Sequence, residues 1–387
     1  MVSELVSQRS YATEAGTRRF AHRHGAGKAA DAYSQLAHLE LSSVGIGTYL
    51  GQPSEETDEA YQVAIVDAVR RGINVIDTAA NFRCQRSERA VGLALQQLIA
   101  DGEIYRSEVL VASAAGMVAF ESEPPSNKAH FLHSTTVGRG LCDEGELVAG
   151  CHCMAPAFLA QSIEKSLENL GLSTLDIYYI HNPETQLHLI ERPLFFERLR
   201  RAFEVLEAAV QRGQLRAYGI TSWMGVRARP SDRDYLSLQE VLEVAHDVAG
   251  SRHHCKALQI PVNLAMPEAF LHPNQPVRGQ LLTALDAARQ LGLVVFGSSP
   301  LHQGRLVQRR LAHVPPLPAM CQLPDHDPAA VEALQFARSV PGVASSLVGM
   351  RRPEHVATAA RLLYHPRAPL EWLCSAARPN LSSSYVG

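Results

Sequence analysis

Short apolar runs alternate with amphipathic stretches along most of this chain. The runs span four to eight residues rich in Val, Ile, Leu and Ala, as expected of strands that are buried on both faces. The stretches between them carry apolar residues at helical spacing, for example Ala60, Val63 and Ala64. The pattern predicts strands at 41–48, 73–77, 109–113, 175–180, 215–220, 257–260, 293–296 and 343–348. It predicts helices at 55–71, 87–98, 155–170, 195–212, 235–248, 279–291, 328–340 and 353–363, with Ser87 as the cap of the second helix.

This alternation predicts a single (β/α)8 barrel over residues 39–363. Strands that alternate with helices form parallel sheets, and eight repeats favour closure of the sheet. A doubly wound open sheet is the alternative, but no G-x-G-x-x-G motif follows any of the strands. The polar segment 1–38 is expected to be a flexible N-terminal arm, and 364–387 a C-terminal tail on the outside of the barrel.

One connection is much longer than the others. Residues 117–153, after the third strand, are rich in Gly, Pro, Ser and His and show no clear periodicity. Connections of this length are usually lids or binding loops. We therefore expect this segment to cover part of the barrel mouth.

Composition narrows the possible partners. The 387 residues are 46% hydrophobic with a net charge of −3, so neither a nucleic-acid surface nor a disordered acidic chain is indicated. No apolar run approaches the ~20 residues that span a bilayer, and the N-terminus lacks the apolar core of a secretion signal. Seven scattered cysteines suit reduced thiols. A cytoplasmic protein with a small-molecule substrate is expected, while its oligomeric state is left open.

Two polar residues follow predicted strands where an α/β barrel places its chemistry. Asp77 ends the second strand and His181 follows the fourth, and the carboxyl ends of the strands form the active-site face of such barrels. For Asp77 the structural alternative is a strand end that hydrogen-bonds the Thr78 amide. For His181 it is a buried ring bonded to a backbone carbonyl.

Several segments together resemble the aldo-keto reductases. Gly72 to Arg83 with Ser87-Glu88 resembles the family signature, and the order of the remaining matches is also that of the family: His181 to Gln186, Gly213 to Ile220, Gln259 to Asn263, Pro300-Leu301 with Gly304 and Leu306, and Leu347 to Arg351 with His355-Val356. The resemblance extends from about 41 to 363. It implies a (β/α)8 barrel that binds NADP(H) and reduces a carbonyl group.

The catalytic residues implied by this resemblance are only half present. The family surrounds the substrate carbonyl with an Asp, a proton-donating Tyr, a Lys and a His. Asp77 and His181 match the first and last, but the Tyr position holds Phe82 and the Lys position holds Ala114. Because a matched general acid contributes ~10²–10⁴-fold to such reactions, this loss predicts altered chemistry.

The resemblance also indicates a cofactor and substrate region. The cofactor would contact Thr221, Ser222, Gln259, Ser298, Pro300, Leu301, Gly304, Gly349, Arg351 and Arg352. Substrate or lid contacts are expected from Tyr49, Phe82, Arg83, Asn182 and Trp223. NADP(H) binding is an open expectation, because the aromatic residue that stacks on the nicotinamide in the family is replaced by Ser298.

The remaining motif is Cys151-His152-Cys153. Adjacent residues rarely ligate one metal ion together, so no metal site is predicted.

Three functional hypotheses follow from the sequence. The first is an atypical NADP(H)-linked oxidoreductase for a small carbonyl or alcohol, or a non-redox acid/base enzyme (dehydration, isomerisation, cyclisation) that uses Asp77 and His181. The second is a non-catalytic ligand-binding sensor or partner protein. The third is ordinary reduction with His181 as proton donor.

Overall fold

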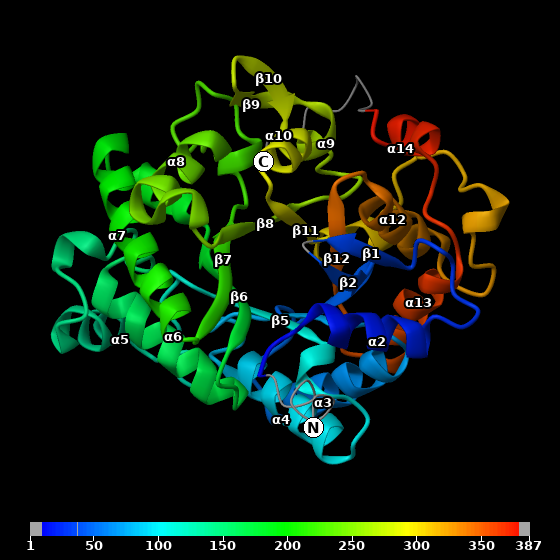
Figure 1. Ribbon diagram of the computed structural model, residues 1–387, viewed down its shortest axis with the longest axis horizontal. Coiled ribbons are helices and arrows are strands. Elements are labelled where there is room, and N and C mark those ends of the chain that lie inside the picture. The colour runs from blue at the N-terminus through cyan, green and yellow to red at the C-terminus, as the bar shows by residue number, and fades with distance from the viewer. Residues whose placement is uncertain (1–9, 37, 379–387) are drawn as a thin grey trace.

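The computed structural model describes residues 10–36 and 38–378. Eight parallel strands form a closed barrel in the order β11-β12-β3-β4-β5-β6-β7-β8 (Figure 1). These strands are β3 Val44–Gly47, β4 Val75–Asp77, β5 Leu110–Ala115, β6 Leu175–His181, β7 Leu215–Thr221, β8 Cys255–Pro261, β11 Val294–Ser298 and β12 Val343–Gly349. The predicted (β/α)8 barrel is confirmed.

Helices surround the barrel, and most follow the predicted ranges. They are α3 Glu55–Arg70, α4 Arg86–Ala100, α6 Pro156–Leu170, α7 Arg192–Gln211, α8 Leu238–Ala249, α10 Ala284–Gln290, α12 Pro328–Ser339 and α13 Pro353–Arg361. The helix predicted for 279–291 is partly wrong. A hairpin of β9 Pro273–Val277 and β10 Gln280–Thr283 precedes α10, with Gly279 in its turn at φ +80°.

Alternation along the strands separates two apolar layers. One face packs against the helices, and the other fills the barrel. The interior cluster is built from every second residue of successive strands, including Ala112 and Ala114 of β5, Tyr179 of β6 and Phe296 of β11. The interior is therefore a packed core, and the chemistry is confined to the barrel's ends.

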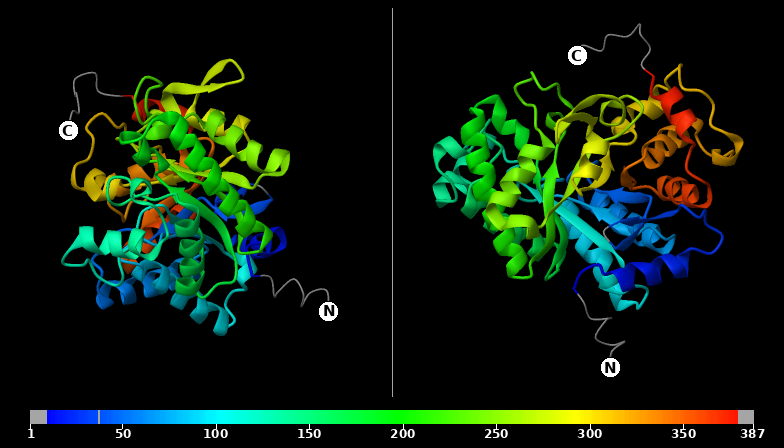
Figure 2. Two further views of the ribbon diagram at one scale, coloured as in Figure 1. Left: turned by 90° about the vertical axis from the view of Figure 1, so that its left-hand side faces the viewer. Right: turned by 45° about the horizontal axis from the view of Figure 1, so that its top comes forward.

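Residues 10–36 and 38–42 close the amino end of the barrel. Helix α2 (Glu14–His24) and the hairpin of β1 (Tyr33–Leu36) with β2 (Leu39–Ser42) lie there, and Ala12 and Leu41 join the interior cluster. The views in Figure 2 place this blue segment beside the orange and red C-terminal elements. A direct contact between the two is the hydrogen bond from the Ala29 amide to the Leu363 carbonyl, 2.9 Å long.

Helix α2 packs too closely for the loose arm expected from the sequence. A Cβ added to Gly16 would lie 2.0 Å from the Ser107 carbonyl oxygen. Arg19 and Arg23 both pair with the fully buried Glu108, at 2.7 and 2.8 Å. The prediction of a flexible arm is therefore wrong for residues 10–36 and 38, while 1–9 and 37 lie outside the described part of the chain.

The two remaining irregular segments contain helices as well. The loop 117–153 carries α5 (Lys128–Thr135) on the periphery of the molecule (Figure 1). The C-terminal tail forms α14 (Leu370–Ala376), whose Trp372 is buried. Among the described residues, no helix has the length and apolar character needed to cross a membrane.

Candidate active site

Asp77 is the last residue of β4, and its carboxyl group is almost completely enclosed. Its exposed fraction is 7%, and burial raises its pKa from 3.8 to about 7. Gln259 Nε2 donates a hydrogen bond of 2.7 Å to Oδ1. The Thr78 amide donates to the Ala112 carbonyl instead of to Asp77, so the structural alternative for this residue is not observed. Asp77 is thus partly protonated at neutral pH.

No lysine stands beside Asp77. The chain has four lysines, all described: Lys165 pairs with Glu168, Lys128 and Lys256 are exposed, and Lys28 lies before β4 at the other end of the barrel. Ala114 is buried and lies opposite Tyr179 across the β5–β6 pair. The aromatic ring of Tyr179 belongs to the same interior cluster. Tyr179 therefore helps to fill the interior beside Ala114.

The Tyr179 hydroxyl group has no hydrogen-bond partner among the described residues. Burial raises its pKa well above the ordinary value, and the nearby Asp77 carboxyl group raises it further. A phenol in this state holds its proton tightly. Tyr179 is consequently not an acid that could replace the tyrosine missing at position 82.

His181 ends β6 with its ring between aromatic and polar neighbours. Nδ1 lies 3.2 Å from Asn81 Oδ1, and the ring meets Phe82 edge to face at 5.8 Å between centroids. Because Asn81 Oδ1 can only accept, the ring proton is assigned to Nδ1 and Nε2 carries a lone pair. Burial, and secondarily the nearby His152, lowers the His181 pKa to about 4. His181 is a neutral hydrogen-bond acceptor at pH 7.

Phe82 and Tyr49 form an aromatic wall near His181. Their rings meet at 5.0 Å, and Tyr49 remains 52% exposed. The three residues that follow Phe82, namely Arg83, Cys84 and Gln85, all have positive φ angles of 50–69°. Such conformations strain residues other than glycine, so neighbouring contacts must hold the turn.

Side chains of the turn supply these contacts. Arg83 forms a buried ion pair with Asp58 and lies 5.2 Å from the centroid of the Tyr61 ring. Gln85 Nε2 donates to the Phe120 carbonyl at 3.1 Å. Arg83 thus binds within the protein, and the structure does not present it as a substrate contact. Gln85 also precedes α4 without a side-chain cap, so the prediction that Ser87 caps this helix is wrong.

His152 lies at the end of the long loop and joins it by hydrogen bonds to His181 and Gln186. Its Nε2 lies 2.9 Å from the His181 carbonyl oxygen, and Nδ1 lies 3.1 Å from Gln186 Nε2. Gln186 Oε1 in turn accepts a hydrogen bond of 2.8 Å from Arg198. Gly116, at φ +117°, leaves room here, because a Cβ would meet His152 Nε2 at 3.1 Å. Both His152 nitrogens are used, and the described residues contain no metal-binding group of three or more His, Cys, Asp or Glu side chains.

Two residues predicted to contact the cofactor, Thr221 and Ser222, donate their hydroxyl hydrogen bonds to other side chains of the protein. Thr221 Oγ1 donates to Asn182 Oδ1 at 3.1 Å, and Ser222 Oγ donates to Glu184 Oε1 at 3.0 Å. Glu184 also accepts hydrogen bonds from the backbone amides of Trp223 and Met224. Thr221, Ser222, Asn182 and Glu184 therefore fix the loop that follows β7.

Other predicted cofactor residues keep free polar groups. Gln259 uses one N–H for Asp77, which leaves its carbonyl oxygen and second N–H available. Ser298 ends β11, and Pro300, Leu301 and Gly304 lie in the turn that follows. Arg351 is half-buried after β12 near Gly349 and has no carboxylate partner among the described residues, whereas the exposed Arg352 lies 3.9 Å from Glu354.

Three residues of the site are not predicted from the sequence: Asn81, His152 and Tyr179. Tyr179 could have been found, because it lies two residues before His181 and therefore on the same face of the strand. Nothing in the sequence pattern indicated that Asn81 would contact His181. The histidine bonded to a backbone carbonyl, proposed as the alternative for His181, is in fact His152.

Comparison with known proteins gives consistent relatives. Residues 43–229 match the family model described as Aldo/keto reductase family. The NADH-specific methylglyoxal reductase of Escherichia coli is 29% identical over 186 residues, which cover 47% of this chain and 48% of that protein. Aldose reductase B of Dictyostelium discoideum is 31% identical over 148 residues, which cover 38% of this chain and 34% of that protein. The chain spans about half the length or less of these curated relatives.

Solved structures share the fold over nearly the whole chain. An aldo/keto reductase from Klebsiella pneumoniae in complex with NADP and acetate has a TM-score of 0.58 at 18% identity, covering 90% of this chain and 96% of that one. The holo form of an aldo-keto reductase from Bacillus halodurans also has a TM-score of 0.58, at 17% identity, covering 89% and 94%. Residues 43–229 thus match the aldo-keto reductase family in sequence, and the chain shares the barrel fold of these solved aldo-keto reductases.

Proposed function

We propose that this protein is an atypical NADP(H)-linked oxidoreductase for a small carbonyl or alcohol substrate, in which the carboxyl group of Asp77 is the proton donor. The observation that carries the proposal is the buried carboxyl group, which has no neighbouring cation among the described residues. A lysine at position 114 would hold Asp77 ionised, whereas burial alone raises its pKa to about 7. A carboxylic acid poised near neutral pH can protonate a substrate oxygen and be reprotonated afterwards.

The free groups of the site suit the cofactor. Arg351 lacks a carboxylate partner among the described residues and has the planar fork of donors that binds phosphate. Gln259 and Ser298 offer an amide and a hydroxyl group at the mouth of the barrel. When bound, NADPH supplies a hydride to the substrate carbon. Thr221 and Ser222 do not belong to this set, because their hydroxyl groups are already hydrogen-bonded.

His181 has a different role from proton donation. With its proton on Nδ1 toward Asn81, its Nε2 accepts a hydrogen bond from a substrate hydroxyl group. It therefore orients an alcohol or hydroxycarbonyl, and the hypothesis of ordinary reduction with His181 as donor is disfavoured. Phe82 and Tyr49 add an apolar wall beside it.

The first experiment is calorimetric titration of the purified protein with NADPH, followed by a screen of small aldehydes and ketones. We expect binding and slow reduction. Asp77→Asn should lower kcat by ~10²–10⁴-fold while leaving NADPH affinity within a few-fold of wild type. Asp67→Asn is the matched control, because it removes a half-buried carboxylate of α3 that pairs with Arg71, away from the candidate active site. Unchanged turnover in Asp77→Asn would refute the assignment.

A second candidate is a non-catalytic NADP(H)-binding protein. The replacement of the family tyrosine by Phe82 favours it, because no side chain of the usual acidity stands at that position. Binding of NADPH with no turnover across the screen would support this candidate. Absence of NADPH binding by the folded protein would instead direct attention to a non-redox acid/base step at Asp77 and His181.

A further inference from the structure

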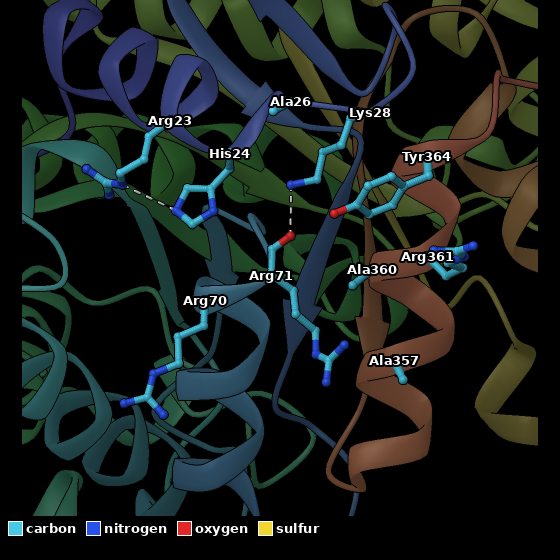
Figure 3. A pocket seen from close by; sticks show the side chains of 10 residues that line it. All are labelled: Arg23, His24, Ala26, Lys28, Arg70, Arg71, Ala357, Ala360, Arg361 and Tyr364. Atoms are coloured by element: carbon cyan, nitrogen blue, oxygen red, sulfur yellow. Dashed lines mark hydrogen bonds between the residues drawn. The ribbon is translucent and has the colours of Figure 1, made fainter.

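A cavity of about 400 Å³ lies at the amino end of the barrel, away from Asp77. The end of α2, the turn that follows it, the end of α3 and the region around α13 line it (Figure 3). Arg70 and Arg71 lie just before β4, whereas Asp77 ends that strand. The cavity and the candidate active site are therefore at opposite ends of the barrel.

The walls of this cavity carry positive charge without acidic residues. The lining residues are Arg23, His24, Ala26, Lys28, Arg70, Arg71, Ala357, Ala360, Arg361 and Tyr364. Three of the arginines pair with carboxylates that are not part of the wall: Arg23 with Glu108, Arg70 with Glu103 and Arg71 with Asp67. Lys28 and Arg361 have no carboxylate partner among the described residues.

Lys28 lies in the wall between two aromatic rings. Its Nζ is 5.6 Å from the centroid of the Tyr33 ring and 5.7 Å from that of Tyr364. It donates to the Arg71 carbonyl at 2.9 Å (Figure 3). Burial lowers its pKa to about 8. Lys28 is therefore a half-buried ammonium group, and no carboxylate of the described residues neutralises it.

The neighbouring His24 experiences the same positive field. Burial lowers its pKa to about 4, and the charges of Lys28 and Arg23 contribute to the lowering. On the other side, the Arg361 guanidinium lies 5.4 Å from the centroid of the Tyr364 ring. A helix-capping role explains the bond from Lys28 to the end of α3. It does not explain Arg361 or the absence of acids from a wall built by three separate segments.

We propose that this cavity binds a phosphorylated small molecule. Lys28, from the turn after α2, and Arg361, from α13, bring positive charges without carboxylate partners among the described residues to the wall, and such donors suit the several acceptor oxygens of a phosphate group. The volume is in the range of small-molecule sites, and the partly exposed Tyr364 ring offers an apolar surface to the rest of an ester.

The site depends on parts of the chain outside the segment that matches the family. Arg23, His24 and Lys28 precede the match at 43–229, and Arg361 and Tyr364 follow it. A bound anion would join the N-terminal segment to the barrel. The proposal does not require NADP(H) binding or catalysis at the other end.

The test uses inorganic pyrophosphate as the probe, with the full chain at constant ionic strength. We expect millimolar pyrophosphate to raise the Tm by several degrees, whereas sodium chloride of matched ionic strength does not. Calorimetric titration should show an affinity about tenfold weaker in Arg361→Gln, which loses one charge-assisted contact. Lys28→Met should weaken it similarly, and circular dichroism of both variants confirms folding.

The matched control separates this cavity from the proposed cofactor region. Arg351→Gln removes a guanidinium group at the opposite end of the barrel and should leave the pyrophosphate-induced change at His24, which lines the cavity, unaltered. Loss of binding in Arg351→Gln but not in Arg361→Gln would overturn the proposal and locate the anion in the cofactor region. Equal stabilisation by matched sodium chloride, or no binding in wild type, would also overturn it. Binding should in addition raise the pKa of His24, measured by NMR.

Discussion

At the scale of single residues, the candidate active site is distinguished by the protonation state of Asp77. A carboxyl group that is 7% exposed and receives one hydrogen bond from a neutral amide is costly to ionise. Its pKa of about 7 exceeds the ordinary value of 3.8, so the folded protein binds a proton here that the unfolded chain releases between these values.

This shift predicts a pH-dependent stability. The raised pKa of Asp77 adds to the free energy of unfolding, by about 4 kcal/mol at most. This stabilisation is complete below about pH 4 and is lost as the pH rises to 7. Asp77→Asn keeps the shape without the titration. The free energy of unfolding of wild type relative to this variant should therefore fall between pH 4 and 7, as measured by urea denaturation. Taking the difference cancels the opposite contributions of His152 and His181, whose pKa values are lowered. A constant difference would contradict the assigned pKa.

Tyr179 makes Ala114 intolerant of a larger side chain. The two residues face each other in the interior cluster, so Ala114→Lys adds both volume and a charge to a filled space. We expect a loss of stability of about 2 kcal/mol or more. A smaller residue at 179 should recover part of it, so the stabilities of Ala114→Lys, Tyr179→Ala and the double variant should be non-additive in urea denaturation. Tyr179→Phe is the control, since it removes only an unpartnered hydroxyl group. Additive effects would show that the two positions are independent.

At this scale, the sequence predicts the position of a residue better than its partners. Asp77 and His181 were placed at the carboxyl ends of strands, and both are there. The partners come from long-range packing: Gln259 is 182 positions from Asp77, and Asn81 is 100 positions from His181. Periodicity carries no information about such pairs. For this reason Gln259 was expected to contact the cofactor and not Asp77.

At the scale of elements, the barrel strands were predictable because they are short apolar runs buried on both faces. Errors arose where local signals were ambiguous. The sequence pattern predicts a helix that begins at Gly279, but this residue forms the turn of a hairpin. Residues 14–24 are polar on most positions, and their helix is stabilised by contacts with Ser107 and Glu108 far along the chain.

The long loop depends on one buried ring. His152 joins the loop's end to the His181 carbonyl and to Gln186, so His152→Ala leaves buried polar groups without partners. We expect a loss of about 1–3 kcal/mol and faster proteolysis within 117–153. Chemical denaturation and timed trypsin digestion measure the two effects. His133→Ala, on the exposed part of α5, is the matched control and should change neither. Wild-type stability in His152→Ala would show that the loop is held elsewhere.

At the scale of the whole molecule, the packed interior separates the two ends of the barrel, which are built from different residues. The carboxyl end carries Asp77 and His181, and the amino end is closed by the N-terminal segment. The sequence predicts the barrel but not the closure of its amino end, because the closure depends on the close fit of α2 against Ser107. The space beside Gly16 admits no Cβ, and a single glycine in a polar segment gives no sign of that.

This separation can be tested at Gly16. Gly16→Ala should displace α2 from Ser107 and lower the free energy of unfolding by about 3 kcal/mol. The pH-dependent contribution of Asp77, measured against Asp77→Asn in the same background, should remain unchanged. Gly145→Ala is the control, because no atom lies within 4 Å of the added Cβ. A changed Asp77 contribution would show that the two ends are coupled.

The facing pair of Ala114 and Tyr179 also sets the order in which substitutions can be introduced into this barrel. A tyrosine at position 82 needs a single change, since the neighbouring turn already holds its left-handed backbone with other side chains. A lysine at position 114 requires a smaller residue at position 179 first. An engineered protein with both the tyrosine and the lysine is therefore reached through an intermediate with a smaller side chain on β6.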